Sequence, residues 1–105
     1  CRAVANMRTE PAEAVTGQWP DGRGGTVRCI CRGATRYGAV AFCENAVVPI
    51  DVSTRYAYRN LCREIVGGFA SGRPAVSAEV MLETVAFIEA AMQSEAAGGA
   101  AAMLN

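Results

Sequence analysis

The spacing of apolar residues changes its period near Ser53, and this change constrains the fold more than any other feature of the sequence. Before Ser53, short segments alternate apolar and polar side chains, as strands with one buried face do. After Ser53, apolar residues recur at intervals of three and four, as on one side of an α-helix. A sheet built from the first half of the chain and covered on one face by two C-terminal helices satisfies both patterns. The sequence therefore predicts an α+β fold.

The first half of the chain predicts an open-faced, mainly antiparallel sheet of three to five strands. The candidate strands are residues 1–8, 13–19, 26–32, 37–43 and 46–52. Residues 19–25, with the sequence WPDGRGG, contain proline, aspartate and glycine in the order of a tight turn, which predicts a hairpin. Pro49 interrupts the last segment, as proline does at a sheet edge or at the end of a strand.

Alternation within residues 26–32 separates two faces of the sheet. One face contains Val27, Cys29 and Cys31, and the other contains Arg28, Ile30 and Arg32. We expect the first set to meet the helices. By elimination, the second set marks the open face of the sheet.

The first predicted helix is capped by Ser53 or Thr54 and ends near Gly72, with Pro74 preventing its continuation. Its apolar residues form a stripe wide enough to cover a sheet: Tyr58, Leu61, Cys62, Ile65 and Phe69. Gly67 and Gly68 lie inside it and cost about 1 kcal/mol each relative to alanine. We expect a bend or fraying at these glycines.

Three arginines follow one another at helical spacing on the opposite side of this first helix. Arg55, Arg59 and Arg63 occupy positions i, i+4 and i+8. They suggest either an anion site or a helix face that is solvated or paired with glutamates, and the second interpretation is the more common in proteins.

The second predicted helix begins at Ser77, a good N-cap, with Glu79 in its first turn. Its apolar stripe, which we expect to face the sheet, comprises Met81, Val85, Ile88 and Met92. At 100° per residue the far side comprises Glu79, Glu83, Glu89 and Gln93. The carboxylates are therefore expected to point to solvent, which argues against a catalytic carboxylate pair. After Ser94 the chain frays, unless Met103 and Leu104 add a strand.

Composition excludes several classes of function. The chain has 10 arginines and no lysine, 10 acidic residues, and no histidine, so it lacks the commonest general base and metal ligand. A net charge of zero gives no reason to expect a nucleic-acid partner. No apolar run approaches the ~18 residues of a membrane span. We therefore expect neither catalytic nor metal-binding residues, and no nucleic-acid or membrane partner.

The 5 cysteines are odd in number and do not have the spacing of a disulfide framework, which favours a reducing, cytoplasmic location. The spacing of Cys29 and Cys31 does not match a zinc site, and we expect the cysteines to be small buried apolar residues. A free-standing thiol or metal enzyme is the remaining alternative that depends on these residues.

The order of a sheet followed by YAYRNLCREIVGGFASGRPAVSAEVMLETVAFIEAAMQSEAAGG at 56–99 resembles the end of the C-terminal domain of Gfo/Idh/MocA-type oxidoreductases. That family often closes with a helix, an SG-[RK]-P-P-V-S break and a final helix of the EE-x-L-E-x-x-A-F-x-E-A-A-x-x-S type. The positions that match are Ser71, Gly72, Arg73, Pro74, Val76, Ser77, Glu79, Leu82, Glu83, Ala86, Phe87, Glu89, Ala90, Ala91 and Ser94. The similarity extends over about 53–99 and is weaker over 19–52.

The resemblance implies a single, partial C-terminal substrate and oligomerisation domain over residues 1–105. In such enzymes a separate Rossmann domain binds NAD or NADP, and the C-terminal domain lines a pocket for a sugar, cyclitol or related polyol. Its sheet face forms the interface of a homo-oligomer, here a dimer or tetramer. The glycine-rich fingerprint and the catalytic lysine have no counterpart in this chain, so no cofactor binding and no activity are expected from it alone.

Residues near turns and helix starts are the candidates for substrate contact: Trp19, Arg36, Arg55 and Tyr56. The interface candidates on the open sheet face are Arg28, Ile30 and Arg32. The alternative function is a stand-alone, non-enzymatic dimerisation or small-ligand-binding α+β module. The sequence that precedes Cys1 in the gene would separate the two.

Overall fold

The computed structural model describes residues 1–104, and the fold is α+β with antiparallel sheets. The strands are β1 (Ala3–Arg8), β2 (Ala12–Gln18), β3 (Gly24–Ile30), β4 (Gly38–Phe42), β5 (Val47–Asp51) and β6 (Ala102–Met103). The helices are α1 (Ala57–Ser71) and α2 (Ala78–Ala96). The chain divides into two compact units: the first contains residues 1–34 and the chain from 76 onward, and the second contains residues 35–75.

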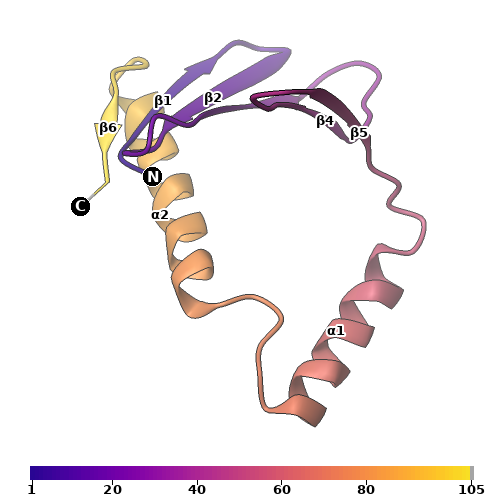
Figure 1. The fold of residues 1–105 in the computed structure, drawn as a ribbon. Coiled ribbons are helices and arrows are strands. Elements are labelled where there is room, and N and C mark those ends of the chain that lie inside the picture. The colour runs from indigo at the N-terminus through magenta and orange to yellow at the C-terminus, as the bar shows by residue number, and fades with distance from the viewer. Residues whose placement is uncertain (105) are drawn as a thin grey trace. The chain divides into compact units, whose positions relative to one another are not determined.

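The first unit is a four-stranded antiparallel sheet with strand order β3-β2-β1-β6, and α2 packs along β1 and β6 (Figure 1). The turn predicted at 19–25 joins β2 to β3, with Trp19 N–H donating to the Arg23 carbonyl at 2.9 Å. At the other end of the unit, β6 pairs with Ala3 and Val4 of β1. The C-terminal segment therefore adds a strand, which the sequence left open.

The core between this sheet and α2 is small. Its buried apolar residues are Val4, Val15, Ala90 and Ala91. Two polar residues are buried with them, and Asn6 N–H donates to Ser94 Oγ at 2.9 Å. Small side chains on α2 allow the helix to approach β1 closely.

Helix α2 presents a different side to the sheet from the one that the sequence predicts. Phe87, Ala90, Ala91 and Ser94 face β1 and β2, whereas the predicted stripe of Met81, Val85, Ile88 and Met92 is 54–65% exposed. The prediction was wrong because hydrophobic counting favours the largest side chains. The sheet instead accepts small residues, together with one serine hydroxyl that pairs with a strand N–H.

Strand β3 shows the predicted alternation, but not the predicted burial. Val27 is paired with Val15, and Cys29 with Glu13, so both lie on the face that α2 approaches. Val27 is nevertheless 52% exposed and Cys29 is exposed, because α2 contacts β1 and does not reach over β3. Cys31 lies beyond the end of the strand and is also exposed.

The cysteines are not the buried apolar residues that the sequence predicts. Cys29, Cys31, Cys43 and Cys62 are exposed, and Cys1 is half-buried. All five are free thiols. Among residues 1–104, no three histidine, cysteine or acidic side chains gather where they could hold a metal ion.

The second unit contains a separate hairpin, β4 with β5, followed by α1. Pro49 is opposite Val40 inside β5. Proline has no N–H to donate, and it is tolerated here because β5 has only one neighbouring strand. No residue of α1 is buried, and Tyr58 and Phe69 are 84% and 85% exposed. The stripe predicted for this helix is therefore not buried.

The end of α1 and the start of α2 follow the predictions, and the start of α1 does not. Helix α1 starts after Tyr56, without a side-chain cap, because Ser53 Oγ accepts instead from Arg55 N–H at 3.3 Å. The helix continues through Gly67 and Gly68 and ends at Gly72, whose φ of 67° is left-handed. In α2, Ser77 is the N-cap and accepts from Val80 N–H at 3.4 Å, as predicted. Glu79 lies in the first turn.

Candidate functional site

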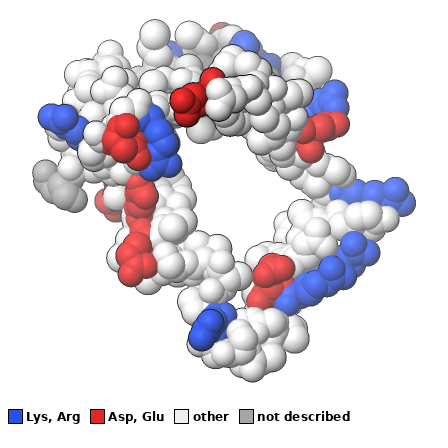
Figure 2. Space-filling model, viewed as in Figure 1, with Lys and Arg blue, Asp and Glu red and all other residues white. Residues whose placement is uncertain are grey.

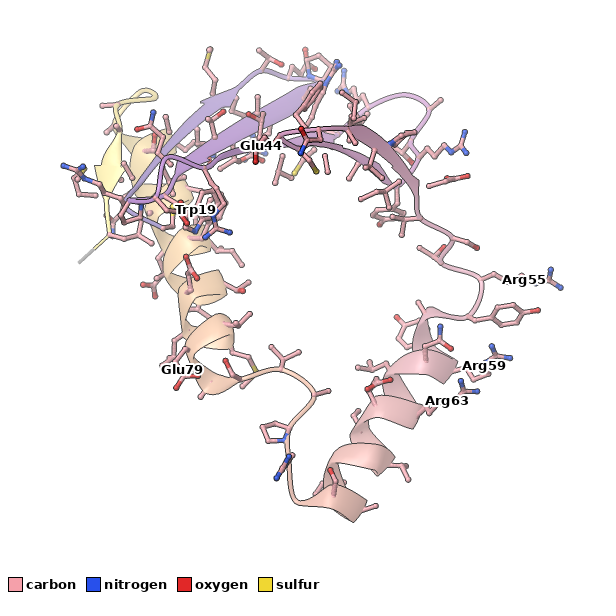
Figure 3. All side chains as sticks on the ribbon, in the orientation of Figure 1. Trp19, Glu44, Arg55, Arg59, Arg63 and Glu79 are labelled. Atoms are coloured by element: carbon pink, nitrogen blue, oxygen red, sulfur yellow. The ribbon has the colours of Figure 1, made fainter. Side chains whose placement is uncertain are left out.

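Trp19 stands at the corner where β2 enters its turn, and the turn fixes its backbone. Gly22 N–H donates to the Trp19 carbonyl at 3.1 Å, and Gly22 has a φ of 89°, which glycine tolerates without strain. Asp21 accepts from Arg23 twice, from the backbone N–H at 3.2 Å and from Nε at 2.7 Å. This local chemistry holds the indole beside α2 (Figure 3).

The indole ring packs between the helix and a part of the sheet that has no side chains. Trp19 and Phe87 stack with ring centroids 6.2 Å apart and an interplanar angle of 17°. Gly17 and Gly25, which are opposite each other on β2 and β3, lie under the rings. The Arg23 guanidinium lies 5.9 Å from the centre of the Trp19 ring, within cation–π range. The indole is thereby held in one orientation.

Glu83 is the carboxylate of this site. Trp19 Nε1 donates to its Oε1 at 2.8 Å, and the backbone nitrogen of Cys1 contacts the same oxygen. These two hydrogen bonds hold the pKa of Glu83 below its ordinary value, so the group is anionic at neutral pH. Both contacts use Oε1, which leaves Oε2 as an acceptor for another donor. Glu83 is exposed, as the sequence predicts, but the rotation of α2 turns its carboxylate toward Trp19 and not away from the sheet.

A surface hollow of about 290 Å³ lies between the indole and α2. We call it the Trp19 hollow, and its lining is mainly apolar: Trp19, Val80, Glu83, Thr84, Phe87 and Ile88. An aromatic wall with one carboxylate suits a ligand that has an apolar face and hydroxyl donors at its edge. Sequence reasoning found Trp19 but missed Glu83 and Phe87, which lie 64 residues or more along the chain.

The other three substrate candidates belong to the second unit. Arg36 Nη2 pairs with Asp51 Oδ2 at 2.6 Å across the open ends of β4 and β5, and both side chains are exposed. The Tyr56 ring has Arg55 at 5.1 Å and Arg59 at 4.1 Å from its centre. The structure thus brings Arg55 and Tyr56 together, with Arg59 as a third member.

Basic side chains gather along one side of α1 (Figure 2), and Arg55, Arg59 and Arg63 project from the helix in the same general direction (Figure 3). Within residues 1–104, the five ion pairs shorter than 4.0 Å involve none of these three arginines. The interpretation of a helix face paired with glutamates therefore fails here. All three arginines are exposed, which is a solvated arrangement.

The interface candidates lie on or beside the sheet face opposite α2. Arg28 is paired with Ala14, and Ile30 with Ala12, so both point away from the helix. Arg32 follows the strand and forms an ion pair with Glu10 at 2.7 Å. We call this side of the sheet the open face, and its other central members are Ala5, Ala14, Thr16 and Thr26. Met7, opposite Ala14, lies on the same face and is 72% exposed.

Comparison of the sequence with protein families, with curated proteins and with solved structures finds no match. None of the helices in the described part of the chain combines the length and the apolar character that crossing a membrane requires. The geometry of the Trp19 hollow and of the open face is therefore the basis for a functional proposal.

Proposed function

We propose that this chain is the substrate-binding and subunit-assembly portion of an NAD(P)-dependent oxidoreductase of the Gfo/Idh/MocA type. The substrate is a sugar, cyclitol or related polyol. The observation that supports this most directly is the Trp19 hollow, where an oriented indole and an anionic carboxylate form adjoining walls. The resemblance over 56–99 supplies the reaction class, and the nicotinamide cofactor is bound by another part of the enzyme.

The chemistry of the hollow matches a ring that bears several hydroxyl groups. The C–H face of such a ring is apolar and packs against the exposed part of the indole, as aromatic side chains prefer. Hydroxyls at the edge of the ring donate to Glu83 Oε2, which has no partner among residues 1–104. The chain contributes position and orientation in this arrangement, and its residues transfer neither hydride nor proton.

Binding is tested by fluorescence, because Trp19 is the single tryptophan of the chain. Titration with myo-inositol and with glucose is expected to change the emission of Trp19 in a saturable way. Glu83→Gln keeps the shape of the side chain but removes the charge, and we expect about tenfold weaker binding, the value of a charge-assisted hydrogen bond. Glu89→Gln, on an exposed part of α2, is the matched control. An unchanged emission, or equal binding by both variants, would refute the proposed substrate class.

The assembly role is tested by substitutions on the two faces of β3, with sedimentation as the measurement. Ile30 lies on the open face and Val27 on the face toward α2. We expect the chain to sediment as a dimer or tetramer, and we expect Ile30→Arg to dissociate it, since a third cation beside Arg28 and Arg32 adds like-charge repulsion to the contact. Val27→Arg, at a position that is already 52% exposed, should leave the assembly intact. A wild-type chain that is monomeric at high concentration would contradict the proposed interface.

A further inference from the structure

Helix α1 has an uncovered apolar side that neither the Trp19 hollow nor the open face uses. Its members are 49–85% exposed: Tyr58, Leu61, Ile65, Val66 and Phe69. At 100° per residue they span an arc of about 140°, as wide as the side that a surface helix normally buries. The rest of the helix is polar or small, so α1 is strongly amphipathic although none of its residues is buried.

Positive charge is concentrated next to this apolar side. Residues 55–73 contain four arginines and one glutamate, whereas the rest of the chain contains six arginines and nine acidic residues. The zero net charge of the whole chain therefore hides a basic segment. Arg59 and Arg63 lie beside the apolar arc, at the edge that Val66 forms, and Arg55 projects in the same general direction (Figure 3). All three are exposed, and no acidic side chain lies within 4.0 Å of them in the part of the chain that the structure describes.

Aromatic side chains stand at both ends of the helix. Tyr58 lies in the first turn and is 84% exposed, and Phe69 lies in the last turn and is 85% exposed. A tyrosine has an apolar ring and a polar hydroxyl, which suits the boundary between hydrocarbon and water. A phenylalanine ring with so little contact to the protein gains free energy wherever it leaves water. Both rings therefore favour a partner with an apolar interior and a polar surface.

The length of α1 determines how it can meet a lipid bilayer. Its 15 residues extend over about 22 Å, which is short of the ~30 Å hydrocarbon core, so it cannot span the membrane. A basic amphipathic helix can instead lie in the plane of the interface, with its apolar side among the upper acyl chains. The expectation of no membrane partner rested on the absence of a span and on the net charge of the whole chain. Neither argument applies to a helix that lies on the surface.

We propose that α1 is a docking surface for a bilayer that contains anionic phospholipids. The apolar side enters the interface, and the guanidinium groups of Arg59 and Arg63 bind lipid phosphates with paired donors. A row of arginines parallel to an apolar stripe matches a flat anionic surface, because all of them reach the phosphates at a similar depth. This inference is independent of the proposed oxidoreductase role, since the Trp19 hollow and the open face belong to the first unit.

The test is cosedimentation of the full chain with vesicles, together with amide hydrogen exchange in α1. Vesicles of phosphatidylcholine alone are compared with vesicles of phosphatidylcholine and phosphatidylglycerol in equal parts. We expect binding to the mixed vesicles only, with slower exchange in α1, and weaker binding as the salt concentration rises. Equal binding to both lipids, or to neither, would overturn the proposal. Polyglutamate, which is acidic but has no apolar interior, is the probe for an acidic partner, and equal slowing of exchange by polyglutamate would also overturn it.

Two substitutions separate the charge from the apolar contact. Arg63→Gln should weaken binding to the mixed vesicles about fivefold, the contribution of one arginine near an anionic bilayer. Phe69→Gln should weaken it by about tenfold or more, because its ring no longer enters the hydrocarbon. The matched controls are Arg2→Gln in the first unit and Phe42→Gln on β4, both at exposed positions, and both should bind like the wild type.

All four substituted positions are exposed, so the variants should fold, which circular dichroism without lipid verifies. If Phe69→Gln binds like the wild type, the chain only adsorbs through its charge and the apolar side does not enter the bilayer. If a variant and its control lose the same affinity, α1 is not the binding surface. If Phe69→Gln lowers the sedimentation coefficient without lipid, a second copy of the chain covers α1. Each of these three results overturns the proposal.

Discussion

The ring of Phe87 occupies the place that a side chain at Gly17 would need. An ideal β-carbon on Gly17 would lie 2.6 Å from Phe87 Cε2 and 3.1 Å from Trp19 Cζ3. Real β-carbons do not approach other atoms as closely as the first of these distances. The stacked pair of aromatic rings therefore depends on a glycine at this position of β2, on the face that α2 covers.

Gly17→Ala should displace the aromatic pair and destabilise the first unit. Inserting a methyl group into a filled contact costs about 1–3 kcal/mol, because neither the strand nor the helix can move away freely. Urea unfolding followed by Trp19 fluorescence measures the loss, and the native emission should shift as the indole becomes more exposed.

Gly25→Ala is the matched control for that substitution. Gly25 is opposite Gly17 on β3, and its β-carbon would meet Trp19 Cζ3 at 3.5 Å, an ordinary contact distance. We expect a change in the free energy of unfolding within about 0.5 kcal/mol. Similar losses at both positions would show that β-sheet glycines in general, and not the contact with Phe87, determine the effect.

Ser94→Ala should remove the hydrogen bond that ties α2 to β1. Ser94 is fully buried and accepts from Asn6 N–H, which would then be left without a partner, at a cost of about 1–3 kcal/mol. The unfolding free energy in urea measures this cost. Gln93→Ala, at the exposed neighbouring position, should change it by less than about 0.5 kcal/mol. Alanine has a higher helix propensity than serine or glutamine, so an equal loss in both variants would show that the hydrogen bond from Asn6 N–H is not what stabilises the fold.

Gly67→Ala should strengthen α1, whereas Gly68→Ala should not. A β-carbon at Gly67 would meet nothing within 4 Å, so alanine there gains about 1 kcal/mol of helix propensity. A β-carbon at Gly68 would lie 3.2 Å from the Arg73 carbonyl oxygen, and this crowding offsets the gain. Amide hydrogen exchange in α1 should slow about fivefold in the first variant. Equal slowing in both would mean that the segment around Arg73 moves away freely.

Local chemistry was readable from the sequence. The turn at residues 19–25 was predictable because Pro20, Asp21 and Gly22 determine backbone angles within a few residues. The same is true of Ser77 as an N-cap and of Gly72 at the end of α1, since each acts on its own turn of helix. The α+β class followed from the period of the apolar residues.

The side of α2 that faces the sheet could not be predicted in this way, because it depends on residues far away in the sequence. Glycine at position 17 makes room for Phe87, and Asn6 N–H requires Ser94, 88 residues away. A count of apolar side chains on an isolated helix includes neither relationship. For this reason the sequence predicts that Glu83 points away from the sheet, while the structure turns it toward Trp19 as the acceptor of the candidate site.

Acid should weaken the turn that positions Trp19, through Asp21. Hydrogen bonds from the backbone and side chain of Arg23 hold the pKa of Asp21 below its ordinary value of 3.8. A carboxyl whose pKa is lower in the folded state contributes stability above its unfolded pKa, and this contribution is lost as the pH falls through the lower, folded value. Asp21→Asn keeps an oxygen for Arg23 N–H but removes the negative charge that attracts the Arg23 guanidinium. The variant should therefore be less stable than the wild type at neutral pH, and the difference should vanish well below pH 3.8. Urea unfolding at both pH values measures it, and a difference that does not change with pH would show that the charge of Asp21 does not stabilise the turn.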